Sequence, residues 1–110
     1  MTARLVTSFW VQAYLTRLRL NDIQAFIVAH GDDNAGAVLV KLSTLDGKAA
    51  AWQRGFHPES GARQWVELLA GDESEVDQTI ARQRGFDRDL WVIEVEDRQG
   101  RHLLDEPGLG

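Results

Sequence analysis

The chain has 110 residues, no cysteine, and a formal net charge of −5 from 17 acidic and 12 basic residues. This length suits one domain with its own core, and the lack of thiols excludes disulfide scaffolds, thiolate zinc sites and cysteine nucleophiles. The acidic balance disfavours nucleic-acid binding, and no apolar run approaches the roughly 20 residues of a membrane span. We expect one cytoplasmic domain over residues 1–110, with residues 105–110 as a frayed tail.

The first predicted element is a helix over about residues 8–20. Val11, Tyr14, Leu15 and Leu18 recur at helical spacing and form one apolar stripe. Thr7 precedes the stripe and is the expected N-cap.

Three strand-like runs follow the helix. Residues 23–30 are apolar at both alternating positions, which is typical of a central strand covered on both faces. Residues 37–43 form the second run, and Asp46-Gly47 predicts a two-residue hairpin turn into a third run that ends near Arg54. That turn sets Lys41 opposite Trp52 on an outer face, where a cation–π contact is expected.

A fourth strand is predicted over residues 63–69, before a second helix. Ser74 and Asp77 form a capping pattern at the start of this helix. Gly85 is the expected terminator, with Phe86 folded back onto the last turn.

The chain is expected to close with a hairpin of residues 90–97 and 101–104. A three-residue loop, Arg98-Gln99-Gly100, keeps the apolar residues of both strands on one face. Hairpins dominate this order of elements. We therefore predict an α+β fold with a mainly antiparallel sheet of five to six strands and two helices packed on one face.

Three possible functional motifs are excluded because the residues around them do not match the pattern that each motif requires. The loop of residues 31–36 has the glycine spacing of a phosphate-binding loop but lacks its lysine and its helix. Asp32, Asp33 and Asn34 do not follow the calcium-loop spacing. Ser60, near His57, lacks the turn that exposes a nucleophilic serine. We therefore predict no metal and no cofactor.

Glu94, Glu96 and His102 are expected to share the polar face of the last hairpin. A histidine between carboxylates can act as acid, base or metal ligand, as in a small hydrolase. The structural alternative is a solvated sheet face with a cross-strand charge pair.

The segment of residues 82–91 is dense in charge and aromatic residues. Arg82 and Arg84, near a helix end, could bind an anionic metabolite. Asp87 and Asp89 could instead pair with these arginines and form a structural ion network.

The chain has four tryptophans, and two of them fall outside the predicted apolar stripes. Trp10 lies at the start of the first helix, and Trp52 lies on a predicted outer face. Partly exposed tryptophan is typical of interfaces, so these two are the candidates for a partner surface.

Three segments also carry a family resemblance: residues 10–13, residues 36–41 and, most specifically, residues 86–102. Over nearly its whole length the chain resembles domain of unknown function family 1491, found mostly in alphaproteobacteria. The resemblance implies a stand-alone bacterial cytosolic domain, and it carries over no activity, cofactor or site.

Together these observations favour a non-enzymatic binding or adaptor module, with a second copy of the chain or another protein as its partner. The alternatives are a hydrolase or metal-assisted enzyme using Glu94, Glu96 and His102, and an anion sensor using Arg82 and Arg84.

Overall fold

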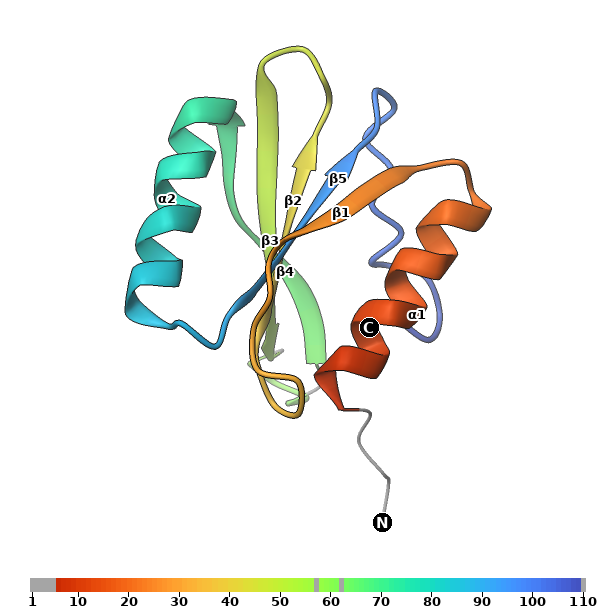
Figure 1. Cartoon of the computed structure of the whole chain (residues 1–110), viewed down its shortest axis with the longest axis vertical. Helices are drawn as coiled ribbons and strands as arrows, with labels where there is room; N and C mark the ends of the chain where they lie inside the picture. Colours follow the sequence, from red (N-terminus) through yellow and green to blue (C-terminus); the bar gives the residue numbers. More distant parts are fainter. Residues whose placement is uncertain (1–5, 57, 62, 110) are drawn as a thin grey trace.

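The computed structural model describes residues 6–56, 58–61 and 63–109, so His57 lies outside the described residues. The elements follow in the order α1 (Thr7–Leu20), β1 (Gln24–Ala29), β2 (Val38–Ser43), β3 (Lys48–Phe56), β4 (Arg63–Asp72), α2 (Glu73–Phe86) and β5 (Trp91–Glu96). The five strands form one sheet in the spatial order β1-β5-β2-β3-β4 (Figure 1). The α+β class is confirmed.

The sheet is mixed, so the prediction of a mainly antiparallel sheet is wrong. β5 pairs antiparallel with β1 but parallel with β2. The physical reason is that β5 inserts between β1 and β2 after the chain has returned through α2. Residues 101–104, which were expected to pair with β5 as a hairpin, are not a strand.

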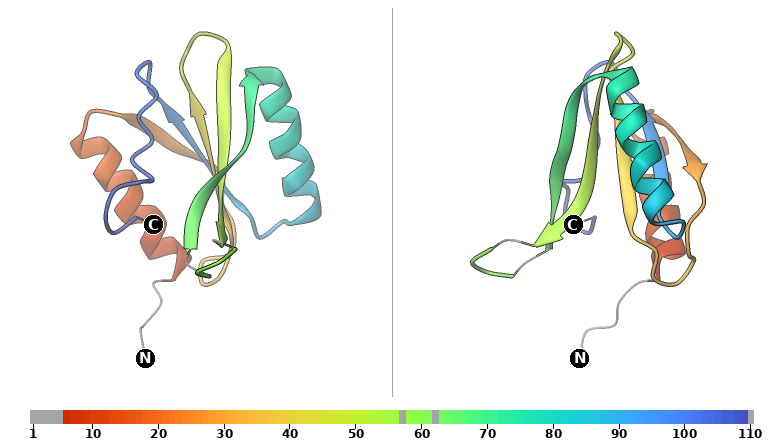
Figure 2. Two further views of the ribbon diagram at one scale, coloured as in Figure 1. Left: turned by 180° about the vertical axis from the view of Figure 1, so that it is seen from behind. Right: turned by 90° about the vertical axis from the view of Figure 1, so that its left-hand side faces the viewer.

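The two helices cover opposite faces of the sheet, and not one face as predicted. Successive strand residues point to opposite faces. α1 packs on a core that includes Val40 and Ile93, whereas α2 packs on one that includes Leu39 and Val92. The edge-on view of Figure 2 follows α2 along its face of the sheet.

The segment after β5 completes the core on the α1 face. The Tyr14 hydroxyl donates to the His102 carbonyl at 2.8 Å, and the Trp65 indole donates to the Leu109 carbonyl at 2.9 Å. Leu109 is 1% exposed. Leu109 is therefore anchored in the core, within the segment that was expected to be a frayed tail, because three leucines after β5 fill the space that α1 leaves open: Leu103, Leu104 and Leu109.

β1 is an edge strand, although its apolar sequence predicted a central one. Only β5 pairs with it, and the pairing slips between Ile27 and Ala29 so that Val28 forms a bulge. Periodicity indicates how apolar a strand is but does not show how many neighbours cover it.

The β2–β3 hairpin has a register one residue away from the predicted one. Lys41 faces Ala51, and Val40 faces Trp52. The Thr44 N–H donates to the Lys48 carbonyl at 3.2 Å, so three residues form the loop instead of two. A one-residue slip moves each side chain to the other face, and this separates Lys41 from Trp52.

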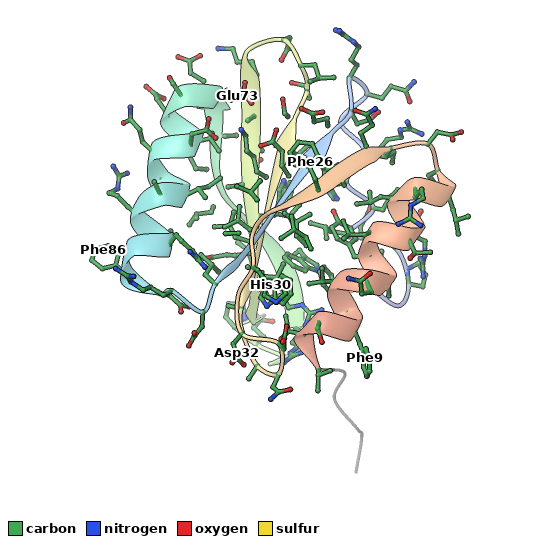
Figure 3. All side chains as sticks on the ribbon, in the orientation of Figure 1. Phe9, Phe26, His30, Asp32, Glu73 and Phe86 are labelled. Carbon is green, nitrogen blue, oxygen red and sulfur yellow. The ribbon has the colours of Figure 1, made fainter. Side chains whose placement is uncertain are left out.

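Helix α2 begins at Glu73, one residue before the predicted cap, and runs through Gly85. Phe86 is exposed instead of folded back on the helix (Figure 3). Among the described residues, no helix is both long and apolar enough to cross a membrane.

A pair of alanine variants tests the packed C-terminal segment. Leu109→Ala is expected to lower the free energy of unfolding by about 2–4 kcal/mol, because it leaves a cavity in the α1-face core. Phe86→Ala, at a residue of α2 that is 88% exposed, is the control and should change it by less than about 0.5 kcal/mol. Urea denaturation measures both, and equal effects would show that the segment does not pack in solution.

Candidate functional site

The most prominent charged cluster surrounds Lys41, in the middle of the sheet face that α2 covers. The side chain of Lys41 is only 6% exposed. Its ammonium lies 2.7 Å from Asp77, 2.9 Å from Glu73 and 3.3 Å from Glu94. Buried ammonium groups are rare unless paired, and here three carboxylates converge on one lysine.

Each partner reaches Lys41 for a reason visible in the fold. Glu94 is the direct neighbour of Lys41 in the parallel β2–β5 pair. Glu73 and Asp77 are four residues apart, so they share the face of α2 that lies over the sheet. The cluster therefore joins the first turns of α2 to the two central strands.

Electrostatics keep Lys41 charged. Burial by itself would lower the pKa of Lys41, but hydrogen bonds to Asp77 and Glu73 and the nearby Glu94 charge hold it above its ordinary value. A lysine in this state cannot act as a general base or nucleophile near neutral pH. The arrangement of Lys41 with its three carboxylates is a structural clamp between α2 and the two central strands.

The sequence did not predict this cluster, since the hairpin turn was assigned one residue too short. Asp77 was interpreted as a capping residue, but no side chain caps the start of α2. The available signal was Lys41 within an apolar strand run, together with acidic residues four apart in the following helix.

Glu94, Glu96 and His102 do not form the predicted group. The two glutamates lie on the α2 face of β5, in register with Lys41 and Ser43. His102 lies on the α1 face, where its ring is 4.7 Å from that of Trp52. The sheet separates the histidine from both carboxylates, because residues 101–104 cross the α1 face and do not pair with β5.

The imidazole of His102 has a structural environment. Its Nδ1 accepts the Leu104 N–H at 2.9 Å. Burial lowers the pKa of His102, and the charge of Asp105 partly opposes this. The neutral ring is therefore the form that the fold favours.

The segment of residues 82–89 forms no arginine–aspartate network. Arg84 donates to the carbonyls of Leu90 at 2.9 Å and His30 at 3.0 Å, which ties the end of α2 to two loops. Arg82 contacts Thr79 in its own helix. Asp87 accepts the backbone N–H of Asp89 at 3.0 Å, as in a tight turn.

The two candidate tryptophans have different surroundings. Trp10 is buried, with its ring stacked 4.9 Å from that of Tyr14 and tilted against that of Trp65 at 5.3 Å. Trp52 is partly buried against the same core. The expectation that Trp10 is exposed is wrong, because the sheet beyond β2 extends under the first turn of α1.

The loop of residues 31–36 packs directly on the strand entry at Asp89 and Trp91. The Trp91 indole donates to the Asp32 carbonyl at 2.8 Å. A Cβ atom at Gly31 would lie 2.2 Å from the Asp89 carbonyl oxygen. The glycine is thus required for close packing. Within the described ranges, no group of three or more His, Asp or Glu side chains could hold a metal ion.

Exposed apolar side chains gather on β1. Phe26 is 46% exposed, Ile27 37% and Val28 56%. Phe26 projects on the α2 face beside Glu94, where α2 does not reach it, and Figure 3 shows it standing apart from Glu73. A shallow groove of about 500 Å³ adjoins the strand. Its lining is mixed and includes Leu15 and Phe26 together with Arg19 and Asp22.

The comparisons with known proteins decide the family. Residues 5–105 match the family described as Protein of unknown function (DUF1491). The chain belongs to this family. A comparison with the curated proteins finds no match to this DUF1491 chain.

Solved structures of similar proteins share the fold. A crystal structure of a DUF1491 family protein from Caulobacter crescentus CB15 has a TM-score of 0.85 at 37% identity, covering 94% of this chain and 98% of that one. An NMR structure of a DUF1491 family protein from the same organism has a TM-score of 0.81 at 36% identity, covering 96% and 97%. The solution structure of protein Atu0922 from A. tumefaciens has a TM-score of 0.72 at 27% identity, covering 86% of each chain.

Removal of the Lys41 ammonium tests the clamp. Lys41→Met is expected to lower the free energy of unfolding by about 2–3 kcal/mol, since three carboxylates then face one another. Because the folded-state pKa of Lys41 is raised, its contribution is complete below the ordinary value of 10.5 and declines only above it. Lys48→Met, which removes an exposed pair with Asp72, is the control and should have little effect. Urea denaturation at pH 7 that finds no difference between the two variants would contradict the clamp.

A second stability prediction concerns His102. Its pKa is lowered on folding, so the unfolded chain binds more protons near and below pH 6.5 and stability is lost as the pH falls through this range. His102→Asn keeps an acceptor for the Leu104 N–H but does not titrate. The variant should therefore show a flatter dependence of unfolding free energy on pH between about 5 and 7. Equal slopes in the two proteins would contradict this assignment.

Proposed function

We propose that this chain is a non-enzymatic binding module that associates with a second copy of itself along β1. The observation that carries the proposal is an apolar edge strand with three exposed side chains: Phe26, Ile27 and Val28. An edge strand presents unpaired backbone N–H and C=O groups, and natural proteins usually protect such edges with charge or proline. β1 carries neither.

Charge favours a second copy as the partner. The chain has a net charge of −5, so most of its surfaces repel one another, but β1 contains no charged residue. The opposite edge strand, β4, carries Arg63, Glu67 and Asp72. Two antiparallel copies of β1 would bring together apolar side chains and glutamine only.

The surroundings of β1 are partly apolar. Leu20 is exposed at the end of α1, three residues before Ile23, whereas the groove beside β1 combines Leu15 with one residue of each charge, Arg19 and Asp22. The bulge at Val28 limits regular backbone pairing to the first part of the strand. The side chains must therefore supply much of the roughly 1,200 Å² that a specific interface requires.

The alternative functions have less geometric support. A hydrolase built from Glu94, Glu96 and His102 would need groups that lie on opposite faces of the sheet. An anion sensor at Arg82 and Arg84 would have to use Arg84, which already binds two backbone carbonyls. We also propose a bacterial origin, since the solved relatives come from Caulobacter crescentus and A. tumefaciens. The cytoplasmic location stays a prediction from the sequence.

Light-scattering mass across a concentration series tests the dimer. The unaltered chain is expected to reach twice the monomer mass. The variants Phe26→Lys and Val28→Lys should stay monomeric, because each places two like charges across the symmetry axis. Lysine at position 26 lies beside Glu94, so the fold should tolerate it.

The matched control is Val66→Lys on the β4 edge, where the side chain is also exposed. This variant should dimerise like the unaltered chain. Since the chain has no cysteine, Phe26→Cys provides a single thiol that should form a disulfide-linked dimer if the two β1 strands pair. A monomer at all concentrations, or a dimer that only Val66→Lys disrupts, would overturn the proposal.

A further inference from the structure

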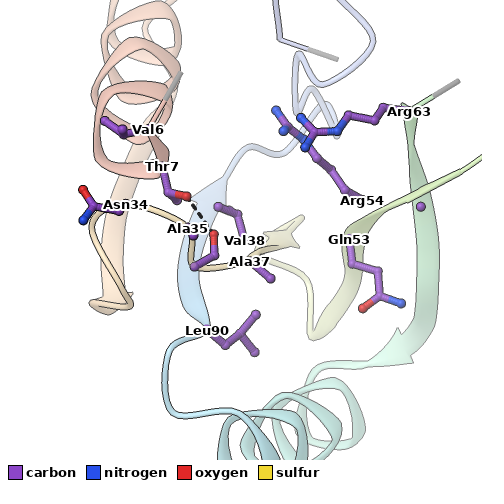
Figure 4. A pocket seen from close by; sticks show the side chains of 12 residues that line it. Val6, Thr7, Asn34, Ala35, Ala37, Val38, Gln53, Arg54, Arg63 and Leu90 are labelled. Carbon is purple, nitrogen blue, oxygen red and sulfur yellow. Dashed lines mark hydrogen bonds between the residues drawn. The ribbon is translucent and has the colours of Figure 1, made fainter. Parts of the chain in front are cut away.

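A cavity of about 400 Å³ opens at the end of the molecule where α1 begins (Figure 4). It lies between the first residues of α1, the loop before β2, and the ends of β3 and β4, which extend beyond β2. This volume is within the range of small-molecule sites. The residues that carry the argument are Thr7, Asn34, Val38, Arg54, Arg63 and Leu90.

The charge of this cavity is opposite to that of the chain. Arg54 and Arg63 are among its lining residues, and no aspartate or glutamate is. In a chain with 17 acidic and 12 basic residues, a lining with two arginines and no carboxylate differs from the average of the chain. Arg54 pairs with Trp65, two residues after Arg63, so both arginines project from the same face of two neighbouring strands. Figure 4 draws both on the same side of the cavity. Converging guanidinium groups are the usual protein ligands for carboxylate and phosphate.

Aromatic rings hold Arg54 in position. Its guanidinium carbon lies 5.0 Å from the centre of the Trp10 ring and 5.3 Å from that of Trp65. Stacking uses the faces of the guanidinium group, whereas its N–H bonds point outward in the plane of the group. Buried Trp10 and partly buried Trp65 therefore limit the movement of a charged side chain at the cavity.

The wall formed by the loop before β2 is equally constrained. Thr7, the first residue of α1 and not its cap, donates its hydroxyl to the Gly36 carbonyl at 2.9 Å. The Asp32 carboxylate accepts the N–H groups of Asn34 and Ala35 at 3.1 and 2.9 Å. A Cβ atom at Gly36 would lie 2.4 Å from the Asp89 carbonyl oxygen. A wall fixed in this way needs little ordering when a ligand binds.

We propose that this cavity binds a small molecule that carries a phosphate or carboxylate group. Arg54 and Arg63 bind the anionic group, and Val38 and Leu90 contact the less polar remainder of the molecule. This site is separate from β1, so ligand binding there does not depend on self-association.

Titration of the 15N-labelled full-length chain with pyrophosphate, and separately with citrate, at constant ionic strength tests the site. Saturable shifts are expected in the amide signals of Thr7, Asn34, Gly36 and Gly55. Loss of a charged hydrogen bond in Arg63→Gln should raise the dissociation constant about tenfold or more. Saturation by pyrophosphate alone would assign a phosphate ligand, and saturation by citrate alone a carboxylate ligand.

Arg82→Gln is the matched control, because Arg82 is exposed on α2 and is not among the cavity-lining residues. It should bind each probe like the unaltered chain. Arg54→Lys keeps the charge but loses the planar stacking, so it should weaken binding and remain folded. Absence of saturable binding by both probes, or equal dissociation constants in Arg63→Gln and Arg82→Gln, would overturn the proposal.

Discussion

The buried ammonium of Lys41 is the constraint on which the arrangement of this molecule depends. An unpaired charge in that position would cost several kcal/mol, so α2, β5 and β2 must be placed to bring Glu73, Asp77 and Glu94 to it. Apolar contacts between α2 and the sheet could form in several alignments, whereas an ammonium with three carboxylates has one good geometry. The clamp thus contributes specificity as well as stability.

The opposite face depends on a different principle. There the chain after β5 crosses the α1 face of the sheet as neither helix nor strand. Its leucines are buried in the core, a role that residues of helices and strands usually have. Side chains satisfy its backbone polar groups individually: Tyr14 binds the His102 carbonyl and Trp65 the Leu109 carbonyl. An irregular segment can form part of a core only if such partners are available. The geometry of this face therefore depends on these polar contacts as much as on the strands.

Local sequence patterns predicted most of the helices and strands, but they did not predict which strands pair with one another. The helix stripe of Val11, Tyr14 and Leu18 and the strand starting at Arg63 were correct, since both depend on residues close in the chain. The position of β5 beside β2 depends on residues about 50 apart, which periodicity does not report. One extra loop residue before Lys48 places Lys41 and Trp52 on opposite faces of the sheet, so the buried cluster and the Arg54 cavity could not be found from spacing.

The strand order has a consequence for how the chain reaches its fold. β1 and β2 become members of one sheet only through β5, which is the last strand to be synthesised. Before residues 91–96 emerge, β2 to α2 can assemble as a hairpin-based unit, but α1 and β1 have no strand to join. Contacts between residues far apart in the chain slow folding. The pairing of β1 and β2 with β5 is therefore expected to form late in folding. Until β5 is present, the amino-terminal elements α1 and β1 cannot join the sheet.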